Sequence, residues 1–219
     1  MSANKRFIEE SFPVKEVSVQ SAREKNIRHG HISTLHIWWA RRPLASSRAT
    51  GYAALIPAPD DALEWNRTSE FIIELSKWEN SLNPVLIEKA REDILKANGG
   101  VPPRVLDPFG GGGAIPLEAL RLGCETYSND YNPVAVLIQK CTLEYPQKYG
   151  HQNNGAGQNE DWGGLSDGGG KNPLLEDVKK WGGWVLEEAK KEIGRFYLEE
   201  EDGSIPVGYI WARTIPCKN

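Results

Sequence analysis

The chain has 219 residues with a formal net charge of −4, and 39% of its residues are hydrophobic and 26% charged. This composition is typical of a globular protein and excludes a chain that is basic throughout. The charge is uneven, because residues 1–50 hold nine lysines and arginines against four acidic residues. A basic amino-terminal segment on an acidic body is compatible with a nucleic-acid contact, and equally with an ordinary solvated face.

The cysteines predict no disulfide framework, because they are odd in number and widely spaced, at Cys124, Cys141 and Cys217. Residues 1–20 are charged and lack the apolar core of a signal peptide. No apolar run reaches the length of a membrane span. We therefore expect a protein of the reducing cytoplasm with no membrane partner.

Residues 1–99 are predicted to form a mostly helical segment. Apolar spacing predicts helices at residues 14–25, 43–55, 69–76 and 84–97. The densest polar and aromatic cluster lies in residues 28–48, which contain three of the four histidines, two of the eight tryptophans and four arginines. Residues 28–37 within it are expected to form a loop.

Three interpretations of this cluster are open. The first is a zinc site formed by His29, His31 and His36, although no cysteine lies near them. The second is a wedge of side chains packed in the core. The third is a surface that binds cofactor and nucleic acid. The guanidinium groups of arginine bind carboxylates and phosphates, and the indole rings of tryptophan stack on bases. On the third interpretation, the residues that contact nucleic acid are Arg28, His31, Arg42 and Arg48.

Residues 100–146 have the pattern of a βαβα core. Residues 104–106 read as a buried strand with Asp107 at its carboxyl end, and residues 114–122 as a helix. Between them, Gly110 to Gly113 are expected to form a turn whose backbone conformation is unfavourable for residues other than glycine. Ligands bind at the carboxyl ends of strands in open α/β sheets, so this turn is a candidate cofactor site.

A second predicted strand, residues 124–130, ends in Asp130, 23 residues after Asp107. An acid at this place binds ribose hydroxyls in dinucleotide folds. The loop has neither the Gly-x-Gly-x-x-Gly spacing nor the Gly-Lys-Ser/Thr of a phosphate loop. An acid at the head of the loop suits a cofactor with positive charge and amine donors, which favours S-adenosylmethionine over a pyrophosphate.

Two motifs resemble those of amino-methylating DNA methyltransferases. The string from Asp107 to Gly113 is similar to their Asp-Pro-Phe-x-Gly-x-Gly cofactor motif, and Asn129-Asp-Tyr-Asn-Pro133 to the motif that follows it. The resemblance implies a partial Rossmann-like class I methyltransferase sheet with an amino-terminal helical extension. It also implies a set of residues that bind S-adenosylmethionine, with Asp130 on the ribose: Asp107, Pro108, Phe109, Gly110, Gly111, Gly113, Asp130, Tyr131 and Asn132.

The amino-terminal cluster extends this resemblance. Residues 35–41 are similar to a His-x-Tyr-Pro-Ala-Arg segment at the methionine end of the cofactor pocket, which adds His36, Trp39 and Arg41 to the expected cofactor residues. The pair of tryptophans departs from that segment. Residues 31–45 resemble more closely the amino-terminal domain of a family of adenine-specific DNA methylases that carry a zinc ribbon. Together these motifs cover roughly residues 10–145.

The carboxyl-terminal third has less pattern. A helix is predicted at residues 133–143 with Pro146 ending it, then a flexible Gly/Asn-rich insertion at 147–171. Residues 172–219 are expected to form a long helix and an edge strand at 209–215. In the family, a zinc ribbon begins with a cysteine at the position of Cys217, and one cysteine cannot hold zinc.

Methyl transfer to an exocyclic amine uses an Asp/Asn-Pro-Pro-Tyr/Phe loop in the family. The nearest strings begin at Asn132 and Asn172, and both lack the second proline and the aromatic residue. We therefore expect no catalytic residue in this chain, which would bind S-adenosylmethionine as part of a DNA methyltransferase without methylating DNA alone. The alternatives are a non-catalytic nucleic-acid-binding or partner-binding subunit, and part of an RNA or small-molecule methyltransferase.

Overall fold

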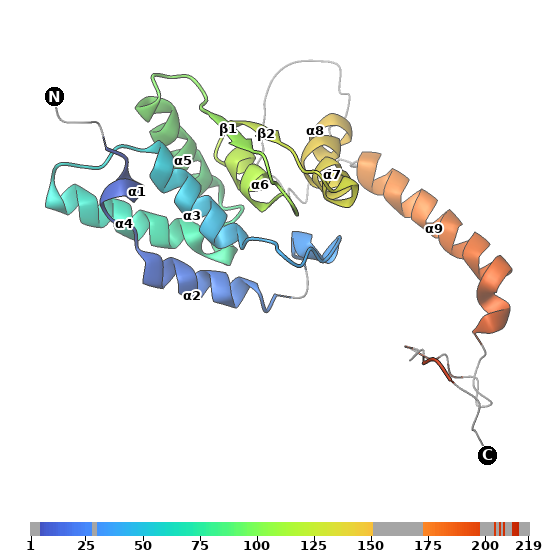
Figure 1. Ribbon diagram of the computed structural model, residues 1–219. Coiled ribbons are helices and arrows are strands. Elements are labelled where there is room, and N and C mark those ends of the chain that lie inside the picture. The colour runs from blue at the N-terminus through green and yellow to red at the C-terminus, as the bar shows by residue number, and fades with distance from the viewer. Residues whose placement is uncertain are drawn as a thin grey trace. The chain divides into compact units, whose positions relative to one another are not determined.

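The computed structural model describes residues 5–27, 30–150, 173–197, 204, 206, 208 and 212–214 (Figure 1). The chain divides into two units, Met1–Gly170 and Lys171–Asn219, which are described separately below. Three parts of the sequence predictions lie outside the described residues: the positions Arg28, His29 and Cys217, most of the insertion at 147–171, and most of the edge strand at 209–215.

The amino-terminal part of the first unit is helical, as predicted. Its helices are α1(Phe7–Glu10), α2(Val14–Glu24), α3(Leu44–Leu55), α4(Ala62–Ser76) and α5(Pro84–Ala97), with short 3-10 turns at Ile32–Thr34 and Trp78–Asn80. The side chains of Asp61 and Asn83 accept hydrogen bonds from the first backbone amides of α4 and α5. The cap at Asp61 is why α4 begins earlier than the predicted residue 69.

The core of this unit lies where α3 packs against its neighbours. Figure 1 shows α3 crossing the middle of the helical layer. Its small residues let the other helices approach closely. Fully buried side chains at this place include four from different helices and one from farther along the chain: Phe7, Ala49, Ile72, Ile94 and Leu122.

The two predicted strands are confirmed as β1(Arg104–Asp107) and β2(Glu125–Ser128), joined by α6(Ala114–Arg121). They pair in parallel, with Asp107 opposite Ser128. Within the described residues the sheet has only these two strands, so the structure supports an α/β element but not the larger Rossmann-like sheet that the resemblance implies. One face of the pair is open to solvent, because Leu106 is 68% and Tyr127 50% exposed.

The segment after β2 differs from its prediction. The expected single helix is divided into α7(Pro133–Gln139), a π-helical turn at Lys140–Glu144 and α8(Tyr145–Tyr149). Pro146 does not end the helix. It stands in the first turn of α8, which continues directly from the π-helical turn.

A buried ion pair joins the helical segment to the βα core. Nη1 of Arg48 lies 3.1 Å from Oε2 of Glu118, and the two side chains are 1% and 0% exposed. Arg48 also donates to the carbonyls of Leu75 and Lys77, at 2.7 and 3.1 Å, and Arg121 donates to Glu118 at 2.6 Å. The prediction that Arg48 contacts nucleic acid is therefore wrong, because its guanidinium is committed inside the fold.

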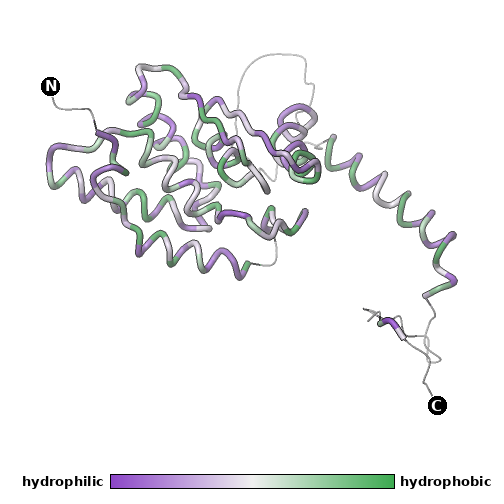
Figure 2. The backbone as a smooth tube through the Cα atoms, viewed as in Figure 1, coloured by the Kyte–Doolittle hydropathy of each residue, from purple (hydrophilic) through white to green (hydrophobic). Residues whose placement is uncertain are grey.

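The second unit contains α9(Pro173–Ile193), which begins at the predicted proline and is followed by a 3-10 turn at Gly194–Phe196. Hydrophobic and hydrophilic residues alternate along α9 in Figure 2. Trp181 and Trp184 meet edge to face at 6.2 Å between ring centroids. Across the described part of the chain, no helix is both long and apolar enough to cross a membrane.

Candidate cofactor site at the glycine loop

The two predicted acids line one cavity. Since β1 and β2 run in parallel with Asp107 opposite Ser128, both strands end at the same edge, and Asp130 follows two residues later. The cavity has a volume of about 420 Å³, within the range of small-molecule sites. Its lining comes from the glycine loop, the strand ends and the amino-terminal cluster: Trp38, Ala40, Arg41, Arg42, Asp107, Phe109, Gly110, Gly111, Gly112, Ala114, Ile115 and Asp130.

The glycine loop, residues 110–113, has a conformation that explains its composition. Gly111 and Gly113 have φ values of 50° and 77°, in the left-handed region that side chains disfavour. The amide of Gly113 donates to the carbonyl of Gly110 at 2.8 Å, which closes the turn directly before α6. The amide of Gly110 donates to the carbonyl of Asn129 at 2.8 Å and so ties the loop to the end of β2.

Both carboxylates support the loop backbone. Asp130 accepts hydrogen bonds from the amides of Gly111 and Asn132, each at 2.8 Å and each on a different oxygen. Asp107 accepts from the amide of Phe109 at 3.1 Å. A carboxylate oxygen has a second lone pair, so each acid can accept a further hydrogen bond from a ligand.

The back of the loop packs against α7. The side-chain amide of Gln139, which is 6% exposed, donates to the carbonyl of Gly111 at 3.1 Å. A Cβ on Gly110 would collide with Oγ of Ser128 and lie 2.8 Å from Nε2 of Gln139. There is accordingly no room for a side chain at Gly110, even though its φ is ordinary.

Gly110→Ala is expected to destabilise the first unit by about 1–3 kcal/mol, because the added methyl group overpacks the contact between the loop and α7. Urea unfolding followed by far-UV circular dichroism measures the change. Gly51→Ala is the matched control, because its Cβ would lie an ordinary 3.5 Å from Leu122. Alanine favours the helix there by about 0.5–1 kcal/mol. Equal unfolding midpoints for the two variants would contradict the packing argument.

The front of the loop is covered by two side chains of the amino-terminal cluster. A Cβ on Gly111 would lie 2.8 Å from Nε1 of Trp38, and one on Gly112 would lie 3.1 Å from Cγ of Arg41. The bare backbone of the loop is therefore used partly for packing. Trp39 stacks on Trp38 with ring centroids 4.2 Å apart, and it is 78% exposed.

The buried carboxylate of Glu24 contacts both Arg41 and the start of α3. Glu24 is 4% exposed, and it accepts hydrogen bonds from the first amides of α3, Leu44 at 2.9 Å and Ala45 at 2.7 Å. Nε2 of His31 lies 2.9 Å and Nη2 of Arg41 3.4 Å from its Oε1. The positive end of a helix and a guanidinium offset the cost of burying this charge.

His31 lies between the carboxylate and the cation. It is 2% exposed and stacks on Trp78, its Nδ1 accepts from the amide of Ser33 at 3.0 Å, and Nη2 of Arg41 is within 3.1 Å of both ring nitrogens. Burial lowers the pKa of His31, and Arg41 lowers it further, while Glu24 acts in the opposite direction. The fold therefore favours the neutral imidazole.

Stability is expected to fall as the pH drops below about 6.5, the ordinary histidine value. Since the pKa of His31 is lowered in the folded state, the unfolded chain binds more protons below that pH, by at most one proton or about 1.4 kcal/mol per pH unit. Urea unfolding between about pH 7.5 and 5.5 measures the slope. His31→Gln should flatten it, whereas replacing the exposed His36 by glutamine should not. A slope that survives His31→Gln would show that other groups cause it.

The structure brings together part of the predicted cofactor set. Six expected residues line the cavity: Arg41, Asp107, Phe109, Gly110, Gly111 and Asp130. Six others do not: His36, Trp39, Pro108, Gly113, Tyr131 and Asn132. Among these, Asn132 caps α7 through the amide of Val134.

Three predictions for the amino-terminal cluster need correction or refinement. His31 was expected on a nucleic-acid surface, but it is buried beside Glu24. The guanidinium of Arg41 faces Glu24, so only its stem reaches the loop. Arg42, assigned to nucleic acid, is exposed and lines the cavity, and its contact with nucleic acid stays a prediction. The residues that sequence reasoning missed are Trp38, Ala40, Gly112, Ala114 and Ile115, and the pair of tryptophans was the one signal that pointed to Trp38.

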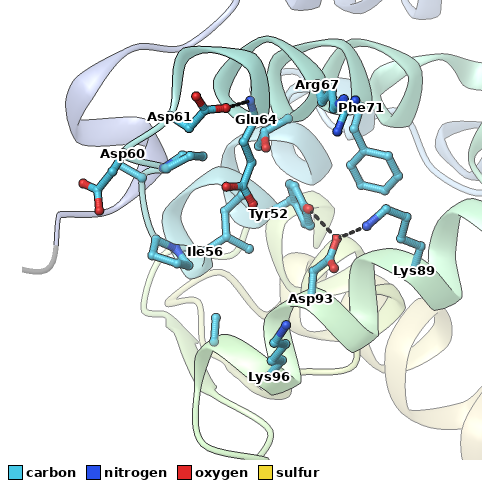
Figure 3. A pocket seen from close by; sticks show the side chains of 15 residues that line it. Tyr52, Ile56, Asp60, Asp61, Glu64, Arg67, Phe71, Lys89, Asp93 and Lys96 are labelled. Atoms are coloured by element: carbon cyan, nitrogen blue, oxygen red, sulfur yellow. Dashed lines mark hydrogen bonds and ion pairs between the residues drawn. The ribbon is translucent and has the colours of Figure 1, made fainter.

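A second cavity of about 910 Å³ lies among α3, α4 and α5 (Figure 3). The hydroxyl of Tyr52 donates to Asp93 at 2.8 Å, and Lys89 pairs with the same carboxylate at 2.7 Å. Burial and the Asp93 charge raise the pKa of Tyr52 strongly. Acidic and basic side chains are nearly balanced around this cavity, so it shows no preference for a charged ligand.

Comparison with known proteins gives one result. Residues 11–80 match a family model described as Protein of unknown function (DUF1156). This match spans less than half of the chain and ends before the glycine loop. No curated protein and no solved structure matches the chain. In the part that the structure describes, no group of three or more His, Cys, Asp or Glu side chains could hold a metal ion.

Proposed function

We propose that this chain is the S-adenosylmethionine-binding portion of a DNA methyltransferase. The enzyme would methylate the exocyclic amino group of a base, of the adenine type. One observation carries the proposal: Asp107, Asp130 and the glycines Gly110 to Gly112 line a single cavity at the carboxyl ends of two parallel strands. That is the place where α/β folds bind nucleoside cofactors.

The chemistry of the lining fits this cofactor. Both acids line the cavity, and in this proposal Asp130 accepts hydrogen bonds from ribose hydroxyls while Asp107 supplies negative charge near the sulfonium. Phe109 and Ile115 give an apolar surface for a purine ring. Arg42 lines the cavity and, among the residues that the structure describes, it forms no ion pair or side-chain hydrogen bond, so its guanidinium can bind a carboxylate.

Binding and methyl transfer are separate in this proposal. The cofactor supplies an activated methyl group, and the residues described above bind and orient it. The amino-methylating enzymes that this chain resembles hold the target amine with an Asp/Asn-Pro-Pro-aromatic string. This string does not occur in the 219 residues. The chain is therefore proposed to bind the cofactor without methylating DNA by itself.

Isothermal titration of the full chain with S-adenosylmethionine and S-adenosylhomocysteine tests the proposal. Saturable heat with both ligands, and none with ATP or NAD, is the expected result. Binding of ATP or NAD with equal affinity would point to a different nucleoside site, and no heat with any of them would refute the cofactor assignment. Incubation with labelled cofactor and DNA should give no methylated product, and methylation by this chain would show that it holds a catalytic loop.

A second function is favoured by one specific observation: Trp39 is exposed and stacks on Trp38, and the exposed Arg42 follows three residues later in the chain. An exposed indole can stack on a base, and an exposed guanidinium can pair with a phosphate. This surface would make the chain a nucleic-acid-binding subunit. A gel shift with single-stranded DNA that is lost in Trp39→Ala, with no response to S-adenosylmethionine, would favour this function over the first.

A further inference from the structure

The segment that matches the family of unknown function reaches the glycine loop through two side chains. Trp38 packs over Gly111, and the stem of Arg41 packs over Gly112. The amide of Arg41 donates to the carbonyl of Trp38 at 3.2 Å, so the two residues belong to one turn. This turn, residues 38–41, forms one wall of the cavity.

Arg41 is fixed at its other end by Glu24. Its guanidinium lies 3.4 Å from Glu24, and the two side chains are 14% and 3% exposed. Glu24 also holds the first turn of α3, which begins directly after the wall. One carboxylate therefore fixes both the cation that contacts the loop and the helix that follows it.

We propose that Glu24 is a positioning residue that sets residues 38–41 against the glycine loop through Arg41. On this view, residues 11–80 complete the cofactor site instead of forming an independent module. The proposal deepens the proposed function by giving that segment a role. The contact between wall and loop exists without ligand, so it can be tested separately.

Arg42, the residue directly after this turn, provides a contrast. It lines the cavity, but it is exposed and does not pair with Glu24. Loss of Arg42 should therefore weaken ligand binding without loosening the loop. Loss of Glu24 or of the Arg41 guanidinium should loosen the loop even in the absence of ligand.

Amide hydrogen exchange of the full, ligand-free chain is the decisive measurement. Glu24→Gln keeps the size of the side chain and removes its charge. It is expected to speed exchange in the peptide covering residues 110–114 by about fivefold, the factor for one net hydrogen bond. Peptides from α5 should be unaffected. The matched control is Glu16→Gln, an exposed glutamate on the same helix, which should leave the loop unchanged.

Arg41 variants show whether Glu24 acts through Arg41. Arg41→Met keeps an aliphatic stem and should reproduce the faster exchange of the loop, while Arg41→Lys keeps the cation and should restore most of the protection. Arg42→Gln should leave exchange of the loop at the wild-type rate. Glu24→Gln could speed exchange throughout the chain, because it also weakens the cap on α3. In that case the exchange of the loop in Arg41→Met tests the proposal, because this variant leaves that cap intact.

Unchanged exchange at residues 110–114 in either Glu24→Gln or Arg41→Met, with faster exchange confined to residues 38–45, would overturn the proposal. S-adenosylmethionine titration forms a separate arm, in which Glu24→Gln should weaken binding about tenfold, or 1.4 kcal/mol. If the wild-type chain binds no cofactor while the exchange result holds, the proposed function fails and the positioning role stands. If the cofactor binds but exchange of the loop is unchanged in the variants, the proposed function stands and the positioning role of Glu24 fails.

Discussion

Replacement of Asp130 by alanine is expected to weaken S-adenosylmethionine binding by a factor of about a hundred or more. Its carboxylate holds the amides of Gly111 and Asn132 and, in the proposed function, also accepts from the ribose. In the proposed function, each hydrogen bond from a ribose hydroxyl to this charged group contributes about 1.5–3 kcal/mol, so the loss of two such bonds costs about 3 kcal/mol or more of binding free energy. Isothermal titration at constant pH measures the change.

Two further variants make this result specific. Asp130→Asn keeps the shape and one acceptor oxygen, so its affinity should fall between those of wild type and Asp130→Ala. Glu92→Ala removes an exposed acid on α5, outside the lining of the cavity, and should bind as the wild type does. Urea unfolding of each variant establishes that the chain is folded. Wild-type affinity in a folded Asp130→Ala chain would remove this residue from the site.

Arg48→Met is expected to cost about 3–5 kcal/mol of the free energy of unfolding, the range for breaking a buried ion pair from one side. The variant leaves Glu118 fully buried with only Arg121 as its cationic partner, and it leaves the carbonyls of Leu75 and Lys77 without this donor. Urea unfolding measures the loss.

The double variant Arg48→Met/Glu118→Leu should be about 2 kcal/mol more stable than Arg48→Met, because no uncompensated charge stays buried. Lys89→Met serves as the surface control. It breaks the ion pair to Asp93, whose side chains are 56% and 33% exposed, and should cost less than about 1 kcal/mol. An Arg48→Met chain as stable as this control would mean that the buried pair does not hold the helical segment to α6.

Local signals in the sequence were sufficient for most elements. Caps, prolines and apolar spacing located α2, α3 and α5, and the alternation of strand, glycines and helix located β1, α6 and β2. The convergence of Asp107 and Asp130 followed from a general rule about parallel strands. Those features depend on residues close together in the chain, where spacing alone carries the information.

The parts that were not predicted depend on distant partners. Arg48 and Glu118 are 70 residues apart in the sequence. The spacing of apolar residues does not indicate that an arginine will be buried in an ion pair with so distant a glutamate. Glu24 and Arg41 are also brought together by the fold rather than by spacing. The choice between Trp38 and Trp39 as the residue on the loop depends on the rotation of one turn, which the sequence of two identical side chains does not specify.

The open face of the two-stranded sheet has a consequence for handling the protein. Parallel strands are ordinarily covered on both faces, whereas Leu106 and Tyr127 face solvent here. Each described strand also has a strand neighbour on one side only. Free backbone donors and acceptors next to exposed apolar side chains are a template for pairing between molecules. We therefore expect concentrated solutions of this chain to self-associate through β1 and β2, and dilute samples are preferable for the titrations and unfolding measurements described above.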